Sequence, residues 1–232
     1  PAPGAMNCWG VIPAAGLGSR LGAALPKQYL EVAGRTLLEH SLRALFADPR
    51  VQGVVVALRA DDERAAGLAC LRDPRVLLTD GGAERADSVA AGLAALRAHA
   101  DADDWVLVHD AARPCLDAQS LGALIDAVEA SGQGAILAQP VSDTVKRSDD
   151  GATVAGTVDR RSLWLAQTPQ LFRLGDLAAA LARAGTVTDE ASAMEAAGHP
   201  VALVPGPRSN FKVTTAEDLV LARCLLAAGE TD

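Results

Sequence analysis

The chain has 232 residues, of which 50% are hydrophobic and 22% charged, and its formal net charge is -8. This composition is typical of a soluble globular protein, and the acidic balance argues against a general nucleic-acid or anionic-membrane surface, which needs a dense field of basic residues. No run of about 18 apolar residues is present to span a bilayer, and the four scattered cysteines, with no CxxC pair, favour a reducing, cytoplasmic compartment.

Short apolar runs alternate with amphipathic segments along the chain. Runs short enough to be buried strands cover residues 8–15, 53–58, 76–79, 105–109, 134–140 and 201–204. Apolar residues at helical spacing, helped by N-cap residues such as Thr36 and Thr215, predict helices over residues 36–45, 89–96, 117–129, 174–184, 189–197 and 216–227. This alternation predicts an α/β protein with a doubly wound, mostly parallel sheet.

One polar segment, residues 141–162, interrupts the alternation. It has β-branched residues on both sides of Asp149, Asp150 and Gly151, a pattern that predicts a hairpin inserted in the sheet protein. No internal repeat or low-complexity linker divides the chain. We therefore predict a single domain over residues 1–232 with an inserted arm at about 140–163.

The strongest local motif follows the first predicted strand and reads "PAAGLGSRL", residues 13–21. The small residues let backbone amides approach a ligand, and Arg20 and Lys27 add two cations that could meet phosphate oxygens. The dinucleotide pattern GxGxxG fails by one residue here, and the P-loop pattern is absent. A glycine-rich turn without a ligand is the alternative interpretation.

Two further polar segments follow predicted strands. Asp110 and Arg113 come at the carboxyl end of a strand, where an Asp can hold a ribose hydroxyl or a metal ion, or where the two residues could form a local ion pair that closes the turn. The segment "GGAERADS", residues 81–88, offers glycine amides and the Ser88 hydroxyl to a base edge or an anion. It is equally consistent with a simple helix N-terminus.

Cations amid hydroxyl and amide side chains occur twice more, at Arg160 with Thr168 nearby and at Lys212. This pattern suits an anionic phosphate, although solvated surface charge is the more common explanation of such isolated motifs. Thr188 stands at what is in most proteins an ordinary helix start. No Ser sits in GxSxG and no Cys has a partner base, so covalent acyl-enzyme chemistry is disfavoured.

Taken together and in order, these segments resemble one enzyme family. "PAAGLGSRL" followed by "PKQ" is similar to the activated-sugar nucleotidyltransferases. The further series "DGGAERADSV", "VHDAARP", "SDTVKR", "TVDR", "LWLAQTPQ", "TDEASAMEAAG" and "NFKVTTAEDL" resembles the 2-C-methyl-D-erythritol 4-phosphate cytidylyltransferase family from about residue 9 to residue 226. Each motif alone is weak, but the ordered series is highly specific.

The resemblance implies a nucleotide-diphospho-sugar transferase-like, Rossmann-type fold with a β-hairpin dimerisation arm. The implied reaction transfers the cytidylyl group of CTP to 2-C-methyl-D-erythritol 4-phosphate in non-mevalonate isoprenoid precursor biosynthesis. It gives 4-diphosphocytidyl-2-C-methyl-D-erythritol and pyrophosphate, with Mg²⁺ as the cofactor. The implied assembly is a homodimer whose arms cross to the neighbouring subunit.

Matching residue by residue, the resemblance also implies the site. Arg20 and Lys27 match its transition-state stabilisers. The positions matching its nucleotide-binding residues are Ala14, Ala15, Gly16, Gly82, Ser88 and Asp110. Those matching its substrate-binding residues are Arg113, Thr144, Arg160, Thr168, Thr188 and Lys212. Asp110 is a possible ligand of the Mg²⁺, which is otherwise held by the CTP phosphates.

Two departures and three rivals accompany this resemblance. Ala83 stands where some relatives carry Asp, and Ser19 where some carry a cation. The closest rival is a sister enzyme that uses ribitol 5-phosphate, against which Ala112 and Cys115 argue. The others are an enzyme that makes a different nucleotide sugar and a non-catalytic nucleotide-binding module.

Overall fold

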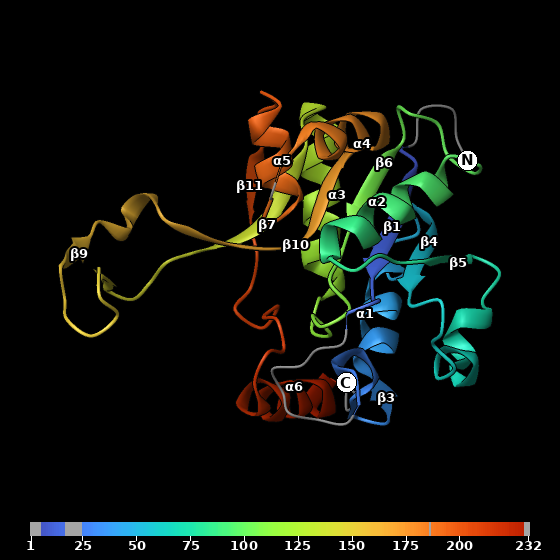
Figure 1. The fold of residues 1–232 in the computed structure, drawn as a ribbon, viewed down its shortest axis with the longest axis horizontal. Helices are drawn as coiled ribbons and strands as arrows, with labels where there is room; N and C mark the ends of the chain where they lie inside the picture. The colour runs from blue at the N-terminus through green and yellow to red at the C-terminus, as the bar shows by residue number, and fades with distance from the viewer. Residues whose placement is uncertain (1–5, 17–24, 186, 230–232) are drawn as a thin grey trace.

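The structure, a computed structural model, describes residues 6–16, 25–185 and 187–229. A seven-stranded sheet runs through the molecule in the order β11-β7-β10-β6-β1-β4-β5 (Figure 1). Its strands are β1 (Cys8–Pro13), β4 (Val51–Leu58), β5 (Val76–Asp80), β6 (Trp105–Val108), β7 (Ala135–Pro140), β10 (Trp164–Arg173) and β11 (Ala202–Pro205). All neighbours pair in parallel except β10, which is antiparallel to both β6 and β7. The predicted fold class is confirmed.

The strand order reverses direction at β1. From β1 the chain moves outward to β4 and then β5, and it returns to pair β6 with the opposite edge of β1. In open α/β sheets such a reversal leaves a crevice at the carboxyl ends of the two central strands, and ligands bind there. Here the crevice opens after Pro13 and Val108, where the sequence placed its first two polar motifs.

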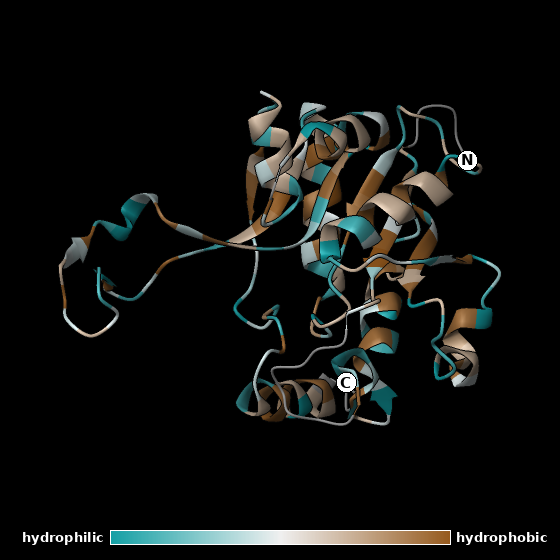
Figure 2. Ribbon diagram, in the orientation of Figure 1, coloured by the Kyte–Doolittle hydropathy of each residue, from teal (hydrophilic) through white to brown (hydrophobic). Residues whose placement is uncertain are grey.

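Both faces of the sheet are covered by helices, as Figure 1 shows. Residues alternate along the strands, so that Val54 and Val56 of β4 join one core cluster while Val55 joins the other. On one face lie α1 (Leu37–Leu45) and α3 (Ala118–Ser131), and on the other lie α2 (Arg85–Leu96), α4 (Leu174–Arg183) and α5 (Glu190–Ala196). In Figure 2 the central strands are mostly brown, the colour of apolar residues.

The last helix, α6 (Ala216–Gly229), lies away from the sheet and packs on a small hairpin. The hairpin strands are β2 (Glu31–Val32) and β3 (Arg35–Thr36), and a third apolar cluster joins Val32, Leu37, Val213 and Ala222. This cluster brings the segment around Lys212 to the same end of the molecule as the segment that begins at Lys27. The amphipathic helix α1 starts at Thr36 with the predicted capping box to Glu39.

The predicted hairpin arm is present and projects from the body of the molecule (Figure 1). Its stem continues the antiparallel pair of β7 and β10, and its outer part holds β8 (Val145–Arg147) paired with β9 (Gly156–Val158). The arm exposes large apolar side chains, among them Val154 at 66% and Leu165 at 56%.

Strand β10 is the main element that the sequence analysis did not predict. Its segment carries Gln167, Thr168, Pro169 and Gln170, which indicated a polar motif rather than a strand in the middle of the sheet. These four residues are buried in the structure, and the Thr168–Pro169 peptide bond is cis. Short 3-10 turns were not predicted either: η2 (Lys27–Tyr29), η3 (Ala65–Gly67), η4 (Ala69–Arg72) and η5 (Arg160–Ser162). None of the helices in the described ranges is long and apolar enough to cross a membrane.

Candidate active site

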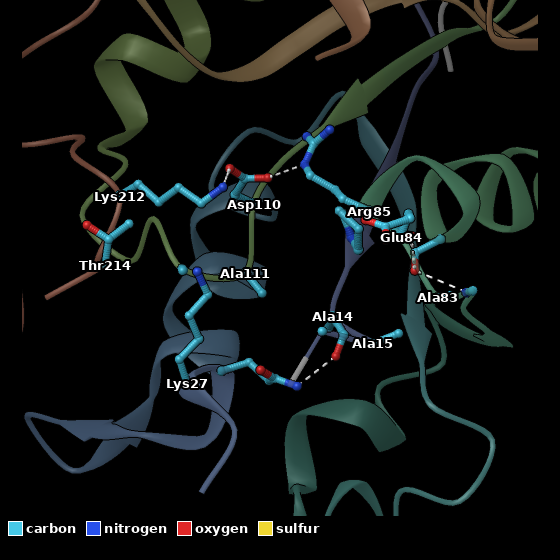
Figure 3. A pocket seen from close by; sticks show the side chains of 16 residues that line it. Ala14, Ala15, Lys27, Ala83, Glu84, Arg85, Asp110, Ala111, Lys212 and Thr214 are labelled. Atoms are coloured by element: carbon cyan, nitrogen blue, oxygen red, sulfur yellow. Dashed lines mark hydrogen bonds and ion pairs between the residues drawn. The ribbon is translucent and has the colours of Figure 1, made fainter. Parts of the chain in front are cut away.

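A cavity of about 460 Å³ opens at the carboxyl ends of β1, β5 and β6. Its volume lies within the range of small-ligand pockets. Its lining combines three strand-end loops with the segments at Lys27 and Lys212: Pro13, Ala14, Ala15, Gly16, Lys27, Gln28, Gly82, Ala83, Glu84, Arg85, Ser88, Asp110, Ala111, Ala112, Lys212 and Thr214. In Figure 3 the two lysines lie on one side of the cavity, opposite Ala14 and Ala15. Eight residues of the predicted site thus meet in one place.

The loop after β1 forms the floor of this cavity and is tied to the segment of Lys27. Ala14 donates its backbone N–H to the Ala57 carbonyl at 2.8 Å, which continues the β1–β4 ladder by one residue. The buried Gln28 side chain donates from Nε2 to the Ala14 carbonyl oxygen at 2.8 Å. Lys27, next to Gln28, is therefore held at a fixed place relative to the backbone of the loop.

The loop after β5 packs against the loop after β1 and forms the adjoining wall of the cavity. A Cβ atom on Gly81 would lie 2.6 Å from the Ala15 Cβ and 2.8 Å from the Ser88 Oγ, so only glycine lets the two loops approach this closely. Gly82 donates its backbone N–H to the Ser88 hydroxyl at 3.2 Å, and Ser88 is buried. The Ser88 hydroxyl thus organises the loop that lines the cavity.

Asp110 is the electrostatic centre of the site. Its Oδ1 accepts from Arg85 Nε at 2.8 Å, and its Oδ2 lies 2.8 Å from Lys212 Nζ. Burial opposes ionisation of this carboxyl, but the charges of Arg85 and Lys212 outweigh burial and hold its pKa well below the ordinary value. Asp110 is therefore a carboxylate at neutral pH. The Arg113 Nε lies farther off, 3.9 Å from Oδ2, so the local Asp110–Arg113 pair is looser than the two long-range pairs.

A buried hydrogen-bond chain fixes the backbone behind Asp110. The Asp110 N–H donates to the Thr168 hydroxyl at 3.0 Å, which in turn lies 3.0 Å from His109 Nδ1. His109 Nε2 lies 3.1 Å from the Arg113 carbonyl oxygen. Because the carbonyl can only accept, the network assigns the imidazole proton to Nε2. Burial lowers the pKa of His109 to about 4, so the ring is neutral near pH 7.

Five predicted site residues in the described ranges do not line the cavity. Thr168 lies behind Asp110, and Arg113 donates from Nη1 to the Asn210 carbonyl at 2.7 Å. Thr144 and Arg160 lie exposed on the arm, and Thr188 is exposed just before α5. Arg20 lies outside the described residues.

Sequence analysis missed the roles of Arg85, Glu190 and Gln28. Glu190 is only 1% exposed, and its two carboxylate oxygens accept hydrogen bonds from Arg85 Nη1 and Nη2 at 2.6 and 3.0 Å. Its segment, "TDEASAMEAAG", belonged to the ordered series, but the motif by itself indicated only a helix start. Glu190 stands three and four residues before Ala193 and Met194, so it lies on the buried side of α5. This helical spacing is the sequence signal that could have indicated a buried carboxylate.

Metal-ligating clusters are not found in the described ranges, where no group of three or more His, Cys, Asp or Glu residues is arranged to hold an ion. Both carboxylate oxygens of Asp110 already accept from cationic side chains. In this arrangement Asp110 does not fit the role of a direct Mg²⁺ ligand, since a hard cation would have to displace Arg85 or Lys212 from it.

The sheet is doubly wound and has a polar cavity at its switch point. Loops of small residues wall this cavity, and two lysines reach it. These features define a nucleotide-binding α/β protein. The family model described as 2-C-methyl-D-erythritol 4-phosphate cytidylyltransferase matches residues 8–228. The chain belongs to the 2-C-methyl-D-erythritol 4-phosphate cytidylyltransferase family. It is a nucleotidyltransferase of the non-mevalonate isoprenoid route, as its residue motifs implied.

Individual relatives agree with this assignment along nearly the whole chain. The chain is 54% identical over 223 residues to the 2-C-methyl-D-erythritol 4-phosphate cytidylyltransferase of Laribacter hongkongensis, covering 95% of this chain and 96% of that protein. It is 51% identical to the enzyme of Pseudomonas putida, covering 91% and 92%. The crystal structure of the Thermus thermophilus enzyme superposes with a TM-score of 0.79 at 36% identity, covering 96% and 100%.

Proposed function

We propose that CTP occupies the cavity at the β1–β6 switch point, and that the acceptor 2-C-methyl-D-erythritol 4-phosphate enters beside Lys212. Cytosine and ribose would rest against the backbone and small side chains of Ala14, Ala15, Gly16, Gly82 and Ser88, with Asp110 at the ribose. The observation that supports this most is the meeting of three strand-end loops with two lysines on the opposite side (Figure 3). The base and the phosphates of a nucleotide need those two different surroundings.

The proposed chemistry is direct displacement at the α-phosphorus of CTP. The acceptor phosphate is already ionised, so the attack needs no general base. The protein must instead align two polyanions and neutralise the charge that develops on the phosphate oxygens. Lys27 lies where it can do this, held by the neighbouring Gln28, and we assign the same role to Arg20.

Residues around Asp110 would hold the acceptor. We assign Lys212 to the acceptor phosphate and Arg113 to the space between nucleotide and polyol, with Thr168 and Thr188 as supporting polar positions. Lys212 has its Nζ on a carboxylate that borders the cavity, so a small rotation lets it meet a phosphate. Asp110 keeps the lysine extended toward the cavity until the acceptor arrives.

The family uses a divalent metal with CTP, and we propose that the metal here is Mg²⁺, held by the phosphates of CTP. The cations gathered around Asp110, which are Arg85, Arg113 and Lys212, support this alternative over ligation by Asp110, because they repel a divalent cation. When bound, the ion neutralises phosphate charge, the same task that we assign to Lys27.

We also propose that the whole chain is one nucleotidyltransferase domain working as a cytoplasmic homodimer with exchanged arms. Arg160 and Thr144 lie on the arm, away from the cavity of their own chain, and the arm exposes large apolar side chains. Arg160 would complete the acceptor-phosphate site of the neighbouring subunit. The cysteines, which are all free, suit a reducing compartment.

Pyrophosphate release with purified enzyme tests the proposal. CTP with 2-C-methyl-D-erythritol 4-phosphate should give steady release, whereas UTP, or ribitol 5-phosphate in place of the acceptor, should give little. Lys212→Ala should raise the acceptor KM by roughly 10- to 100-fold with a small change in the CTP KM. Equal turnover with ribitol 5-phosphate would contradict the acceptor assignment, and an unchanged acceptor KM in Lys212→Ala would place the phosphate elsewhere.

A further inference from the structure

Arg85 borders the nucleotide cavity, yet all of its charged nitrogens are already engaged. Its Nε donates to Asp110, and its Nη1 and Nη2 donate to the two oxygens of Glu190 at 2.6 and 3.0 Å. Glu190 is 1% exposed, and the Arg85 side chain is 28% exposed. A cation beside a polyanion site ordinarily binds the polyanion, but the fork of this guanidinium faces away from the cavity toward a buried carboxylate.

Asp110 has two oxygens, and its two close cationic partners take one each, while the Nε of Arg113 lies farther away, 3.9 Å from Oδ2. Arg85 takes Oδ1, which leaves Oδ2 to Lys212 (Figure 3). If the terminal nitrogens of Arg85 were free, the guanidinium could turn and take both oxygens of Asp110 as a bidentate pair, the geometry that Arg prefers with carboxylates. Lys212 would then lose its partner. By engaging the terminal nitrogens, Glu190 prevents this exchange.

We propose that Glu190 and Arg85 are positioning residues for the transfer reaction: Glu190 holds Arg85 so that it occupies only one oxygen of Asp110, and the other oxygen keeps Lys212 aimed at the acceptor site. Glu190 is not among the residues that line the cavity, and Arg85 lines it with its terminal nitrogens held by Glu190. The inference rests on the proposed role of Lys212 and extends that role to two side chains on α2 and at the start of α5.

The arrangement also brings four distant parts of the chain together. Arg85 begins α2, Asp110 follows β6, Glu190 begins α5 and Lys212 precedes α6. With Arg113, whose Nε lies 3.9 Å from Asp110 Oδ2, the group holds three cations and two carboxylates. When Lys212 turns to an arriving phosphate, the two carboxylates and the guanidinium groups of Arg85 and Arg113 remain and balance in charge.

Glu190→Gln tests the proposal, since glutamine keeps the size of the side chain and removes its charge. We expect kcat/KM for the acceptor to fall by roughly 10- to 100-fold while the CTP KM changes less than about threefold. Asp48→Asn is the matched control: Asp48 is also a buried carboxylate bound by two nitrogens of an arginine, Arg50, but it does not border the cavity. This control should share any loss of thermal stability and leave the acceptor kinetics unchanged.

A double-mutant cycle separates positioning from general destabilisation. If Glu190 acts through Arg85, then Glu190→Gln should have almost no further effect on acceptor kcat/KM in an Arg85→Gln background. Fully additive effects, or an unchanged acceptor kcat/KM in Glu190→Gln, would overturn the proposal. Should Glu190→Gln fail to fold, Glu190→Asp gives the same test, because the shorter side chain draws the carboxylate back from the terminal nitrogens of Arg85 and should produce the same selective loss.

The outcome for Lys212→Ala distinguishes this inference from the function on which it rests. If Lys212→Ala raises the acceptor KM and Glu190→Gln leaves acceptor kinetics intact, only the positioning role is wrong. If Lys212→Ala itself leaves the acceptor KM unchanged, the assignment of the phosphate to Lys212 is wrong, and the positioning role is wrong with it.

Discussion

Single charges decide the chemistry that we propose for this site, and we assign different tasks to the two lysines at the cavity. Lys27 follows Pro26 at the start of η2 and stands beside the loop that would hold the nucleotide, whereas Lys212 pairs with Asp110 at 2.8 Å. The first can stabilise charge that appears during displacement, and the second can hold charge already present on the acceptor. Such a division predicts opposite kinetic signatures for the two substitutions.

Lys27→Ala should lower kcat by roughly 100- to 1000-fold with a small change in the CTP KM, because its interaction strengthens only as charge develops in the transition state. Steady-state pyrophosphate release at saturating acceptor measures it. Lys146→Ala, on the exposed arm strand β8, is the matched control and should keep the parent kcat. A large rise in CTP KM with unchanged kcat would instead make Lys27 a ground-state ligand.

His109 predicts a pH dependence of stability. Its ring is buried and its folded-state pKa is lowered to about 4, while in the unfolded chain it protonates near the ordinary value of about 6.5. Between these values the unfolded chain binds more protons, so the stability that His109 contributes is present above about pH 6.5 and is lost as pH falls toward 4. The difference is about 3 kcal/mol at most.

Denaturant unfolding at pH 7, 6 and 5 measures this loss. The His109→Gln variant, which has no imidazole to protonate, should show a weaker fall of the unfolding free energy over that interval than the parent. Parallel curves for the two proteins would show that another group governs the dependence.

At the scale of elements, the hydrogen bond between Gln28 and Ala14 joins the turn η2 to the loop after β1. Gln28, the residue after Lys27, is 3% exposed, and its side-chain amide donates to the Ala14 carbonyl oxygen. Tyr29, the following residue, donates its hydroxyl to Asp62 at 2.7 Å and so anchors the other side of the same turn. The position of Lys27 therefore depends on two neighbours rather than on its own side chain alone.

Gln28→Ala should lower kcat by roughly tenfold and destabilise the fold by about 1–2 kcal/mol, because it removes one buried hydrogen bond and leaves the Ala14 carbonyl unsatisfied. Steady-state kinetics and thermal unfolding measure the two effects. Gln52→Ala removes a similar side-chain bond to a backbone carbonyl, but at an exposed site on β4, and should change neither quantity appreciably. If both variants behave alike, η2 does not position the lysine.

Elements with a clear period were predictable, and elements that depend on tertiary burial were not. The strands at 53–58 and 105–109 and the helices at 117–129 and 174–184 follow from apolar spacing that the structure retains. Strand β10 does not, because its polar residues are buried only once β6 and β7 supply partners on both sides. Likewise, no local spacing pairs Arg85 with Glu190, which lie 105 residues apart.

At the scale of the whole molecule, the arm separates one part of the predicted site from the rest. The residues around Asp110 are brought together by the sheet, whereas Arg160 lies on η5 of the arm, where its Nη1 donates to the Ser142 carbonyl at 2.5 Å. Trp164 and Leu165, where β10 enters the arm, are exposed, as is Leu203 of the edge strand β11. A second chain lying across the arm would cover these apolar side chains and bring Arg160 to a cavity.

Mixed dimers test whether Arg160 acts on the neighbouring chain. Lys27→Ala and Arg160→Ala chains, co-expressed with different affinity tags, give a purified heterodimer. If arms are exchanged, one site carries both defects and the other, with Lys27 from one chain and Arg160 from its partner, is intact. The heterodimer should then have about half the parent activity at low acceptor concentration, while each parental homodimer has far less.

The same heterodimer also tests the alternative that Arg160 acts on the cavity of its own chain. If Arg160 serves the cavity of its own chain, each site of the heterodimer carries one defect, and its activity equals the average of the two variant homodimers. The contrast does not depend on how severe either substitution is, provided that both homodimers fall well below half of the parent rate. Arm exchange also requires that the parent is a dimer at the assay concentration, which size-exclusion chromatography measures. A parent that is monomeric and fully active would contradict arm exchange, because a monomer has no partner arm to complete its site.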